Sequence, residues 1–310
     1  MGSLNYYNDI KELIGNTPIL KLNNLGVNPS VQLFAKLELW NPGGSVKDRI
    51  GKSMIEDAEN RGQLKPGYTI IEATAGNTGL GIALAAINKG YRIIFVVPEK
   101  FSIEKQILMK ALGGEIINTP REKGMLGAME KAKELRLEIP DSIELAQFVN
   151  PSNPLVHYET TGAEIHRALN GEIDYFVAGA GSGGTYTGAL RYLKEKNPKV
   201  KGILVDPEGS TMGGGIEKCY NIEGIGNNFI PETMDMSLVD EVLKVSDEEA
   251  FHIVKELARK EGLIVGTSSA AAVAASLRFA KTISTGNIVT ILPDRGDRYF
   301  SKNLYGAQIL

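Results

Sequence analysis

The chain has 310 residues, which is enough for one large or two medium-sized domains, and we expect two. Its 34 basic residues nearly balance 37 acidic ones, so the composition offers no electrostatic basis for binding nucleic acid or an anionic membrane, and a small neutral or zwitterionic ligand is expected. The single cysteine, Cys219, excludes an intramolecular disulfide framework and is typical of a reducing compartment, so we expect a cytoplasmic protein.

Targeting and metal-binding patterns are not found in the sequence. The N-terminus lacks a basic segment followed by an apolar run, and no apolar stretch approaches the roughly 18 residues of a membrane span. The histidines, His157, His166 and His252, are scattered, so no zinc-type spacing exists. We therefore expect neither a signal peptide, nor a membrane helix, nor a bound metal.

Short β-rich segments alternate with helical ones along most of the chain. The expected strands cover residues 33–36, 69–73, 92–97, 175–178, 202–205 and 288–292. The expected helices cover 46–60, 78–89 and 102–112, and another follows a capping box of Ser246 and Glu249. This alternation predicts an α/β fold with parallel sheets covered by helices. The Asn-Pro pairs of 147–154 mark either a crossing between two closely joined domains or an ordinary loop.

The segment 40–51, WNPGGSVKDRIG, has a lysine at an unusual place. Its Asn-Pro pair and glycines predict a turn, and Ser45 with Asp48 has the form of a capping box that begins a helix. Lys47 then lies in the first turn, where a cation opposes the helix dipole by about 0.3 to 1 kcal/mol. Because desolvation and positive potential both lower a lysine pKa, and a neutral amine can form a Schiff base, Lys47 is a candidate catalytic residue.

A glycine-rich segment, YFVAGAGSGGTYTGAL, connects a predicted strand to a predicted helix. It satisfies G-x-G-x-x-G at Gly179, Gly181 and Gly184. With Asp206 at the end of the next strand, the spacing is that of a dinucleotide fingerprint, which leaves a nicotinamide-dependent dehydrogenase as an alternative. Backbone N–H groups at a helix N-terminus bind any phosphate, however, and the hydroxyls of Ser182 and Thr185 suit a phosphate monoester.

Two further loops precede predicted helices. In EATAGNTGLGIAL, residues Thr74, Asn77 and Thr78 surround two glycines, and they either bind a second anion, such as a substrate carboxylate, or simply cap the helix. In VGTSSAAAVAAS, Ser268 and Ser269 are more typical of N-caps than of ligand contacts. A phosphate loop, a carboxylate loop and a Schiff-base lysine together are what a pyridoxal-phosphate enzyme acting on an amino acid needs.

Five ordered motifs carry a family resemblance. NPGGSVKDR, ATAGNTG, GAGSGGTYTG, EGIGNNFIP and ILPDRGDRY resemble the cysteine synthase and cystathionine β-synthase family of fold-type II pyridoxal-phosphate (PLP) enzymes. The resemblance implies two doubly wound α/β domains with mostly parallel sheets, similar to the tryptophan synthase β chain. It implies a large cofactor-binding domain of residues 1–41 and 148–310, a small mobile domain of residues 42–147, and a homodimer.

The resemblance also implies roles for individual residues. Lys47 would hold the cofactor covalently and move the Cα proton, Asn77 would bind the pyridine 3-hydroxyl, and Ser268 would face the pyridine nitrogen. The phosphate would be bound by Gly181, Ser182, Gly183, Gly184 and Thr185. The substrate would be bound by Thr74, Ala75, Gly76, Thr78 and Gln147 at its carboxylate, and by Gly224, Asn227 and Asn228 near the incoming nucleophile.

The implied reaction is β-replacement on a serine- or cysteine-type amino acid through an aminoacrylate. It would make cysteine from O-acetylserine and sulfide, or cystathionine. Ala75 and VVPEKFSIEKQ are similar to the bacterial cystathionine-forming branch, whereas IPETMDMSLVD is similar to cysteine synthases. Asn227 and Asn228 differ from both branches, so L-cysteine itself is an alternative substrate, releasing sulfide and giving serine or a thioether.

Two other expectations concern partners and turnover. The C-terminal YGAQIL ends in Ile-Leu, and in this family a terminal isoleucine can dock into a partner acetyltransferase. A sensor or scaffold that keeps the fold without turnover remains the alternative outside enzymes. Cys219 has no histidine, asparagine or aspartate partner at a nucleophile spacing, so we expect an inert thiol.

Overall fold

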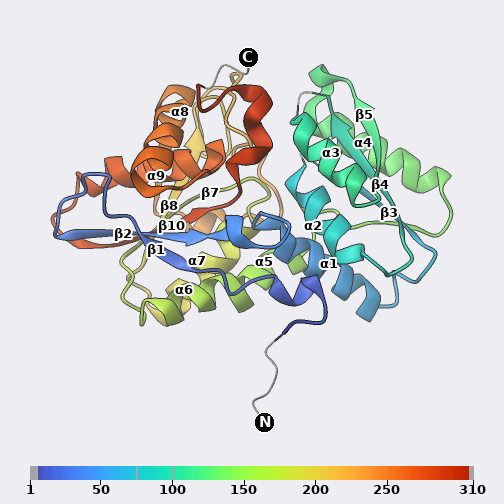
Figure 1. The fold of residues 1–310 in the computed structure, drawn as a ribbon, viewed down its shortest axis with the longest axis horizontal. Coiled ribbons are helices and arrows are strands. Elements are labelled where there is room, and N and C mark those ends of the chain that lie inside the picture. Colours follow the sequence, from blue (N-terminus) through green and yellow to red (C-terminus); the bar gives the residue numbers. More distant parts are fainter. Residues whose placement is uncertain (1–5, 75, 100, 307–310) are drawn as a thin grey trace, which may run out of the picture.

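The computed structural model describes residues 6–74, 76–99 and 101–306, and it contains two sheets with helices on both faces of each. Figure 1 shows the sheets in two lobes, one with β7, β8 and β10 and the other with β3, β4 and β5. This is the α/β, doubly wound architecture that the alternating sequence pattern predicts.

The larger sheet has six strands in the order β1-β2-β10-β7-β8-β9. Its strands are β1 (Ile19–Lys21), β2 (Val31–Leu37), β7 (Tyr175–Gly179), β8 (Lys201–Pro207), β9 (Glu241–Val245) and β10 (Gly286–Leu292). All neighbouring pairs are parallel except β1 with β2. Segments from the two ends of the chain meet in this sheet, because β10 pairs with β2 over the register Gly286 to Val31 through Leu292 to Leu37.

The smaller sheet has four parallel strands in the order β5-β4-β3-β6. Its strands are β3 (Thr69–Ala73), β4 (Arg92–Pro98), β5 (Glu115–Thr119) and β6 (Ser142–Glu144). The sequence analysis located β3 and β4 but not β5 and β6, nor β1 and β9 in the larger sheet. These four strands lie at the sheet edges, and most of their residues are only partly buried or exposed, so their apolar pattern is weak.

The helices cover both faces of each sheet. They are α1 (Lys47–Asn60), α2 (Asn77–Ala86), α3 (Ile103–Ala111), α4 (Gly124–Glu138), α5 (Ser152–Val156), α6 (Ala163–Ala168), α7 (Gly184–Lys196), α8 (Asp247–Glu256) and α9 (Thr267–Ala280). Short 3₁₀ segments are η1 (Ile10–Leu13), η2 (Glu38–Trp40), η3 (Arg121–Lys123), η5 (Met236–Leu238) and η7 (Gly296–Lys302), and π-helical turns are η4 (His157–Gly162) and η6 (Leu257–Glu261). Within the described residues, none of these helices is both long and apolar enough to cross a membrane.

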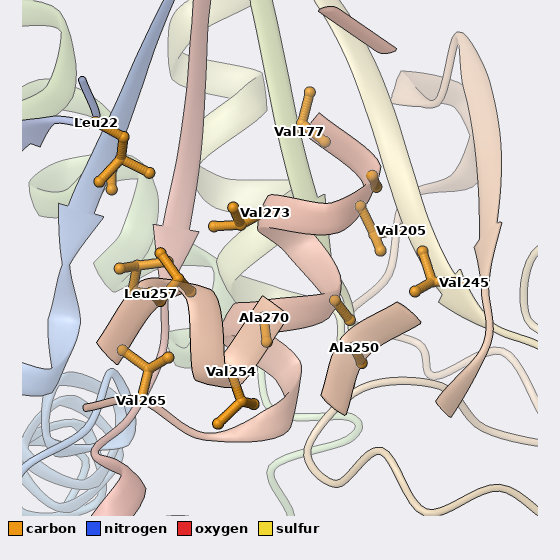
Figure 2. Close-up of a cluster of buried hydrophobic side chains, with 14 of the residues drawn as sticks. Leu22, Val177, Val205, Val245, Ala250, Val254, Leu257, Val265, Ala270 and Val273 are labelled. Atoms are coloured by element: carbon orange, nitrogen blue, oxygen red, sulfur yellow. The ribbon is translucent and has the colours of Figure 1, made fainter. Parts of the chain in front are cut away.

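Each sheet has an apolar core on either face, because successive strand residues point to opposite sides. In the larger sheet, Val177 and Val205 pack under α8 and α9, where Figure 2 shows them with Ala250, Val254 and Val273. Phe176 and Leu204 of the same strands pack against α7 on the other face. In the smaller sheet, one face packs against α1, α2 and α3 and the other against α4. The two lobes therefore have separate cores.

Several predicted helix starts and ends are corrected by the structure. Lys47 does lie in the first turn of α1, but the Ser45–Asp48 capping box does not form, because the Asp48 carboxylate accepts from the Gly43 N–H at 2.6 Å instead. The helix predicted over 78–89 ends at Ala86, because the next residue, Ile87, has a non-helical ψ of 132°. The Ser246 and Glu249 capping box is confirmed at the start of α8.

Candidate active site

One cavity of about 870 Å³ lies where segments of the two lobes meet, and segments following the parallel strands β3, β7 and β10 contribute to its wall. Ligand sites in open α/β sheets are commonly found outside the carboxyl ends of such strands. The predicted site residues that line the cavity are Lys47, Thr74, Gly76, Asn77, Thr78, Gln147, Gly181, Ser182, Gly183, Thr185, Gly224, Asn227, Asn228 and Ser268. Gly184 lies in the same loop without lining the cavity, and Ala75 lies outside the described residues.

Lys47 is the first residue of α1, and it lines the cavity. Its Nζ atom lies 3.5 Å from Ser182 Oγ, across the boundary between the two lobes. Burial of the amine lowers the pKa of Lys47 to about 8, while the Asp294 carboxylate acts in the opposite direction and favours the ammonium. Desolvation is therefore the largest cause of the lowered pKa, which makes the neutral amine accessible near neutral pH.

The glycine loop, residues 181–185, leads from β7 into α7 and presents backbone rather than side chains. Gly183 has a φ of +87°, which favours glycine. A Cβ at Gly181 would lie 2.4 Å from the Gly224 carbonyl oxygen, and one at Gly184 would lie 2.0 Å from Asn153 Oδ1. The loop therefore keeps its N–H groups at the beginning of a 13-residue helix, where an anion is favoured.

Buried side chains hold the hydroxyls of this loop. Ser182 Oγ accepts from Asn153 Nδ2 at 2.9 Å, and Thr185 Oγ1 lies 3.1 Å from Nε2 of His157. The other ring nitrogen of His157 lies 2.8 Å from Thr161 Oγ1, and burial together with the charges of Arg49 and Lys47 holds the pKa of the imidazole well below its usual value. His157 is thus a neutral support of the loop. Sequence reasoning missed it, because nothing near it in the chain indicates that Thr185 is its neighbour.

The asparagine loop, the described residues of 74–79, leads from β3 into α2. Thr74 Oγ1 accepts from the N–H groups of Gly76 and Gly79, at 3.0 and 3.2 Å. Neither Asn77 nor Thr78 caps α2, since the N-cap is Gly76 with a φ of +128°. Thr78 instead donates to Gln147 Oε1 at 2.7 Å. The prediction that these two side chains cap the helix is therefore wrong, and both residues line the cavity.

Asn77 is held by residues far along the chain. Its Nδ2 donates to Asp294 Oδ2 at 2.6 Å, and its Oδ1 accepts from Arg298 Nη1 at 2.8 Å. Asp294 and Arg298 are both buried, and Tyr299 donates to the same carboxylate oxygen at 2.6 Å. All three residues belong to the motif ILPDRGDRY, but no local pattern in the sequence indicates that they contact Asn77.

The third predicted loop begins α9. Ser268 and Ser269 are helix residues rather than N-caps, because the N-cap is Gly266, and Ser268 lines the cavity. Asn227 donates to the Gly181 carbonyl at 2.6 Å, so its side chain braces the glycine loop. Asn228 is exposed and donates to Glu217 Oε1 at 3.1 Å. Cys219 is exposed and also lines the cavity.

The structure gives evidence on two other ligands, a dinucleotide and a metal ion. Asp206 does not line the cavity, and its Oδ2 accepts from Gly213 N at 2.9 Å and pairs with Lys244, so it is not placed for a nucleotide ribose. Within the described residues, no group of three or more His, Cys, Asp or Glu side chains could hold a metal ion. The predicted site residues that line the cavity supply an amine, hydroxyls, amides and backbone N–H groups as donors.

Comparisons with known proteins agree with this donor set. Residues 10–294 match the family described as "Pyridoxal-phosphate dependent enzyme". The chain belongs to this family. The enzyme is 55% identical over 302 residues, 97% of its length and 98% of the relative's, to "O-acetylserine dependent cystathionine beta-synthase" of Bacillus subtilis. It is 47% identical over 301 residues to a cysteine synthase of Helicobacter pylori, covering 96% of this chain and 98% of that one.

The fold is also similar to that of a solved structure. A hydrogen sulfide-producing enzyme from Fusobacterium nucleatum superposes with a TM-score of 0.92 at 39% identity, covering 95% of this chain and 100% of that one. These relatives confirm the resemblance to the cysteine synthase and cystathionine β-synthase family and the fold-type II architecture. The enzyme is PLP-dependent, so the dehydrogenase alternative is set aside.

The residues of the cavity fit this cofactor. The glycine loop lines the cavity at the N-terminus of α7, where backbone N–H groups favour a terminal phosphate. The Lys47 amine lies 3.5 Å from the Ser182 hydroxyl in that loop, and the buried Ser268 lines the same space. A phosphate site, an amine that is readily neutral and polar contacts for a ring are therefore present together.

Proposed function

We propose that the enzyme catalyses PLP-dependent β-replacement on a serine- or cysteine-type amino acid. The observation that carries this proposal is the Lys47 amine, which lies 3.5 Å from Ser182 of the glycine loop in a cavity that also contains the asparagine loop. Two helix N-termini that favour anions therefore flank one lysine, which suits a phosphate at the first and a substrate carboxylate at the second.

The proposed contacts to the cofactor are those that the family resemblance implies, and their support is that these residues lie in the cavity or in the loop that lines it. The phosphate would be bound by Gly181, Ser182, Gly183, Gly184 and Thr185. Lys47 would bind the cofactor covalently, Asn77 would donate to its 3-oxygen, and Ser268 would face its ring nitrogen. A serine hydroxyl does not force that nitrogen to be protonated, so the electron sink that PLP supplies when bound would be moderate.

The proposed work on the substrate is divided between the asparagine loop and the lysine. The carboxylate would be bound by Thr74, Gly76, Thr78 and Gln147, while the role predicted for Ala75 lies outside the described residues. Lys47, whose pKa burial lowers to about 8, would accept the Cα proton as a neutral amine and later return it. The β-substituent leaves with the bonding electron pair of its bond to Cβ, and a nucleophile then forms the new bond at Cβ.

The relatives support two donor and nucleophile pairs. The first is O-acetylserine with either sulfide, giving cysteine, or homocysteine, giving cystathionine, in line with the Bacillus subtilis and Helicobacter pylori relatives. The second is L-cysteine, whose Cβ–S bond breaks to release sulfide before water or a thiol adds. The Fusobacterium nucleatum enzyme, described as hydrogen sulfide-producing, supports the second pair. Gly224, Asn227 and Asn228 line the cavity and would contact the nucleophile.

We also propose how the chain is organised around the site. Residues 42–147 would form a small mobile domain and residues 1–41 with 148–310 a larger one, which the separate cores of the two sheets support. Closure would exclude water from the cavity. A homodimer is proposed from the family resemblance, and a cytoplasmic location from the single cysteine. Docking of an acetyltransferase on the C-terminal tail stays a prediction, because residues 307–310 lie outside the described residues.

A product assay tests the reaction. O-acetylserine, serine and cysteine are each incubated with sulfide, homocysteine, cysteine or water, and the products are identified by mass spectrometry. We expect cysteine or cystathionine from O-acetylserine. If L-cysteine alone yields no sulfide, the second pair is excluded; if no donor yields a β-substituted product, the proposed function is wrong.

A further inference from the structure

Two buried residues that the proposed chemistry does not use meet at Asn77. Arg298 and Asp294 lie after β10 in the larger lobe, 4% and 1% exposed, whereas Asn77 begins α2 in the smaller lobe. They contact opposite ends of one side-chain amide: Arg298 Nη1 donates to Oδ1 at 2.8 Å, and Asp294 Oδ2 accepts from Nδ2 at 2.6 Å. A single amide is therefore held between a guanidinium and a carboxylate.

The roles of donor and acceptor in this network are fixed by chemistry. A guanidinium and an ammonium can only donate, and a carboxylate without its proton can only accept. Lys105 Nζ donates to Tyr299 OH at 2.9 Å, and Tyr299 OH donates to Asp294 Oδ2 at 2.6 Å. If the Asn77 amide flipped, its NH₂ would face the guanidinium and its oxygen would face the carboxylate. Both contacts would become repulsive, so one orientation is enforced.

This orientation leaves one hydrogen of the Asn77 NH₂ group without an acceptor among the residues that the structure describes. Asn77 lines the cavity that contains Lys47 and the glycine loop. A free amide hydrogen at this point can donate to a negatively charged oxygen. The 3-oxygen of PLP, which the proposed function assigns to Asn77, is such a group.

We infer that Arg298 and Asp294 are positioning residues that lock the Asn77 amide so that its NH₂ group donates to the 3-oxygen of the cofactor. The inference rests on the proposed cofactor contact of Asn77. Arg298 also connects the lock to the segment 40–51, which contains Lys47, because its guanidinium donates to the Gly43 carbonyl. Its own backbone carbonyl accepts from Ser102 Oγ at 2.7 Å, which ties the same residue to the start of α3.

The test is a double-mutant cycle on the holoenzyme with two readouts besides activity: the pH at which the visible cofactor band titrates, and the dissociation constant of PLP. Arg298→Met removes the donor and Asn77→Ala removes the amide. We expect each single variant to shift the spectroscopic midpoint by at least about half a pH unit and to weaken PLP binding roughly tenfold, the effect of one charge-assisted hydrogen bond. The double variant should match Asn77→Ala alone, and Arg298→Lys should recover part of the shift.

Controls keep the outcomes distinct. Arg295→Met changes a half-exposed arginine nearby, which pairs with Asp297, and should leave both readouts unchanged. If Arg298→Met does not fold, Asp294→Leu removes the acceptor on the other side of the amide. Because the Asp294 charge also acts on Lys47, we expect the effect of this substitution to be smaller in the Asn77→Ala background than in the unmodified enzyme, without vanishing there. The lock alone would be overturned if Asn77→Ala changed the two readouts while Arg298→Met or Asp294→Leu left them unchanged. It would also be overturned if the effects of the two substitutions simply added in the double variant. An unchanged Asn77→Ala would overturn both the lock and the contact assigned to Asn77, whereas β-replacement itself is judged by product formation.

Discussion

The glycine loop and the asparagine loop both present a helix N-terminus to the cavity, but different groups hold them in place. Each follows a strand and precedes a helix, and each presents a helix N-terminus to the cavity. The glycine loop does so with its own backbone, since Gly181 and Gly184 leave no room for a Cβ, although Asn227 and His157 support it from other segments. The asparagine loop depends on side chains from distant segments, namely Gln147 on Thr78, and Asp294 with Arg298 on Asn77. A local motif therefore predicts the first loop well and the second only in part.

The largest expected effect comes from the lysine between the two loops. Lys47→Ala should lower turnover by about 10³-fold or more, because it removes both the covalent attachment and the group that moves the Cα proton. Steady-state product formation and the visible cofactor band measure this. Lys52→Ala, on the exposed side of the same helix near Glu56, is the matched control and should behave as the unmodified enzyme. Retained activity and colour in Lys47→Ala would contradict the assignment.

The next largest expected effect is on PLP affinity and tests the glycine loop by itself. Gly184→Ala should weaken PLP binding by about 10- to 100-fold, since its Cβ would lie 2.0 Å from Asn153 Oδ1 and the loop would have to move. Equilibrium dialysis against PLP measures the change. Gly62→Ala is a destabilising glycine substitution that does not touch the cavity lining, because its positive φ of +68° strains an alanine although no atom lies within 4 Å of the added Cβ. It should lower thermal stability without changing PLP affinity.

A smaller effect tests the asparagine loop. Thr78→Val keeps the shape of the side chain but removes the 2.7 Å hydrogen bond to Gln147. We expect KM for the amino-acid donor to rise about tenfold while the dissociation constant of PLP stays the same, because Thr78 is assigned to the substrate carboxylate and the cofactor contact of this loop is assigned to Asn77. Initial-rate kinetics with O-acetylserine give the first number. Equal losses in both constants would show that the two loops are not separable in this way.

The smallest expected effect concerns Asp294. Burial lowers the pKa of Lys47 to about 8, and the Asp294 carboxylate raises it, so removing that charge should lower it further. Covalent uptake of PLP by the cofactor-free protein requires a neutral amine, so its rate should rise with pH through about 8. In Asp294→Asn the midpoint should move to lower pH, by less than about one unit. Asp297→Asn, an exposed carboxylate nearby, is the control, and a midpoint that moves upward would contradict the expectation.

The sequence alone predicted much of the fold and the parts of the site that are local. The central strands, the first turn of α1 with Lys47, and the glycine loop all have their signal within a few residues, because periodicity and glycine spacing act over that range. The ordered motifs also indicated the family that the comparisons show. The edge strands β1, β5, β6 and β9 were missed, because they are short and mostly only partly buried or exposed.

Only the tertiary structure decided which distant side chains complete the site. The Ser45–Asp48 capping box was a sound local prediction, yet Asp48 accepts from Gly43 instead. His157 behind Thr185, and Asp294 and Arg298 on Asn77, join segments that are 28, 217 and 221 residues apart along the chain. The two hydrogen bonds on Asn77 exist only after two separate cores have brought the ends of their strands together, and the one between His157 and Thr185 only after η4 packs against α7 in the larger lobe. No local pattern carries that information, because the partners share neither a helix, nor a strand, nor a turn.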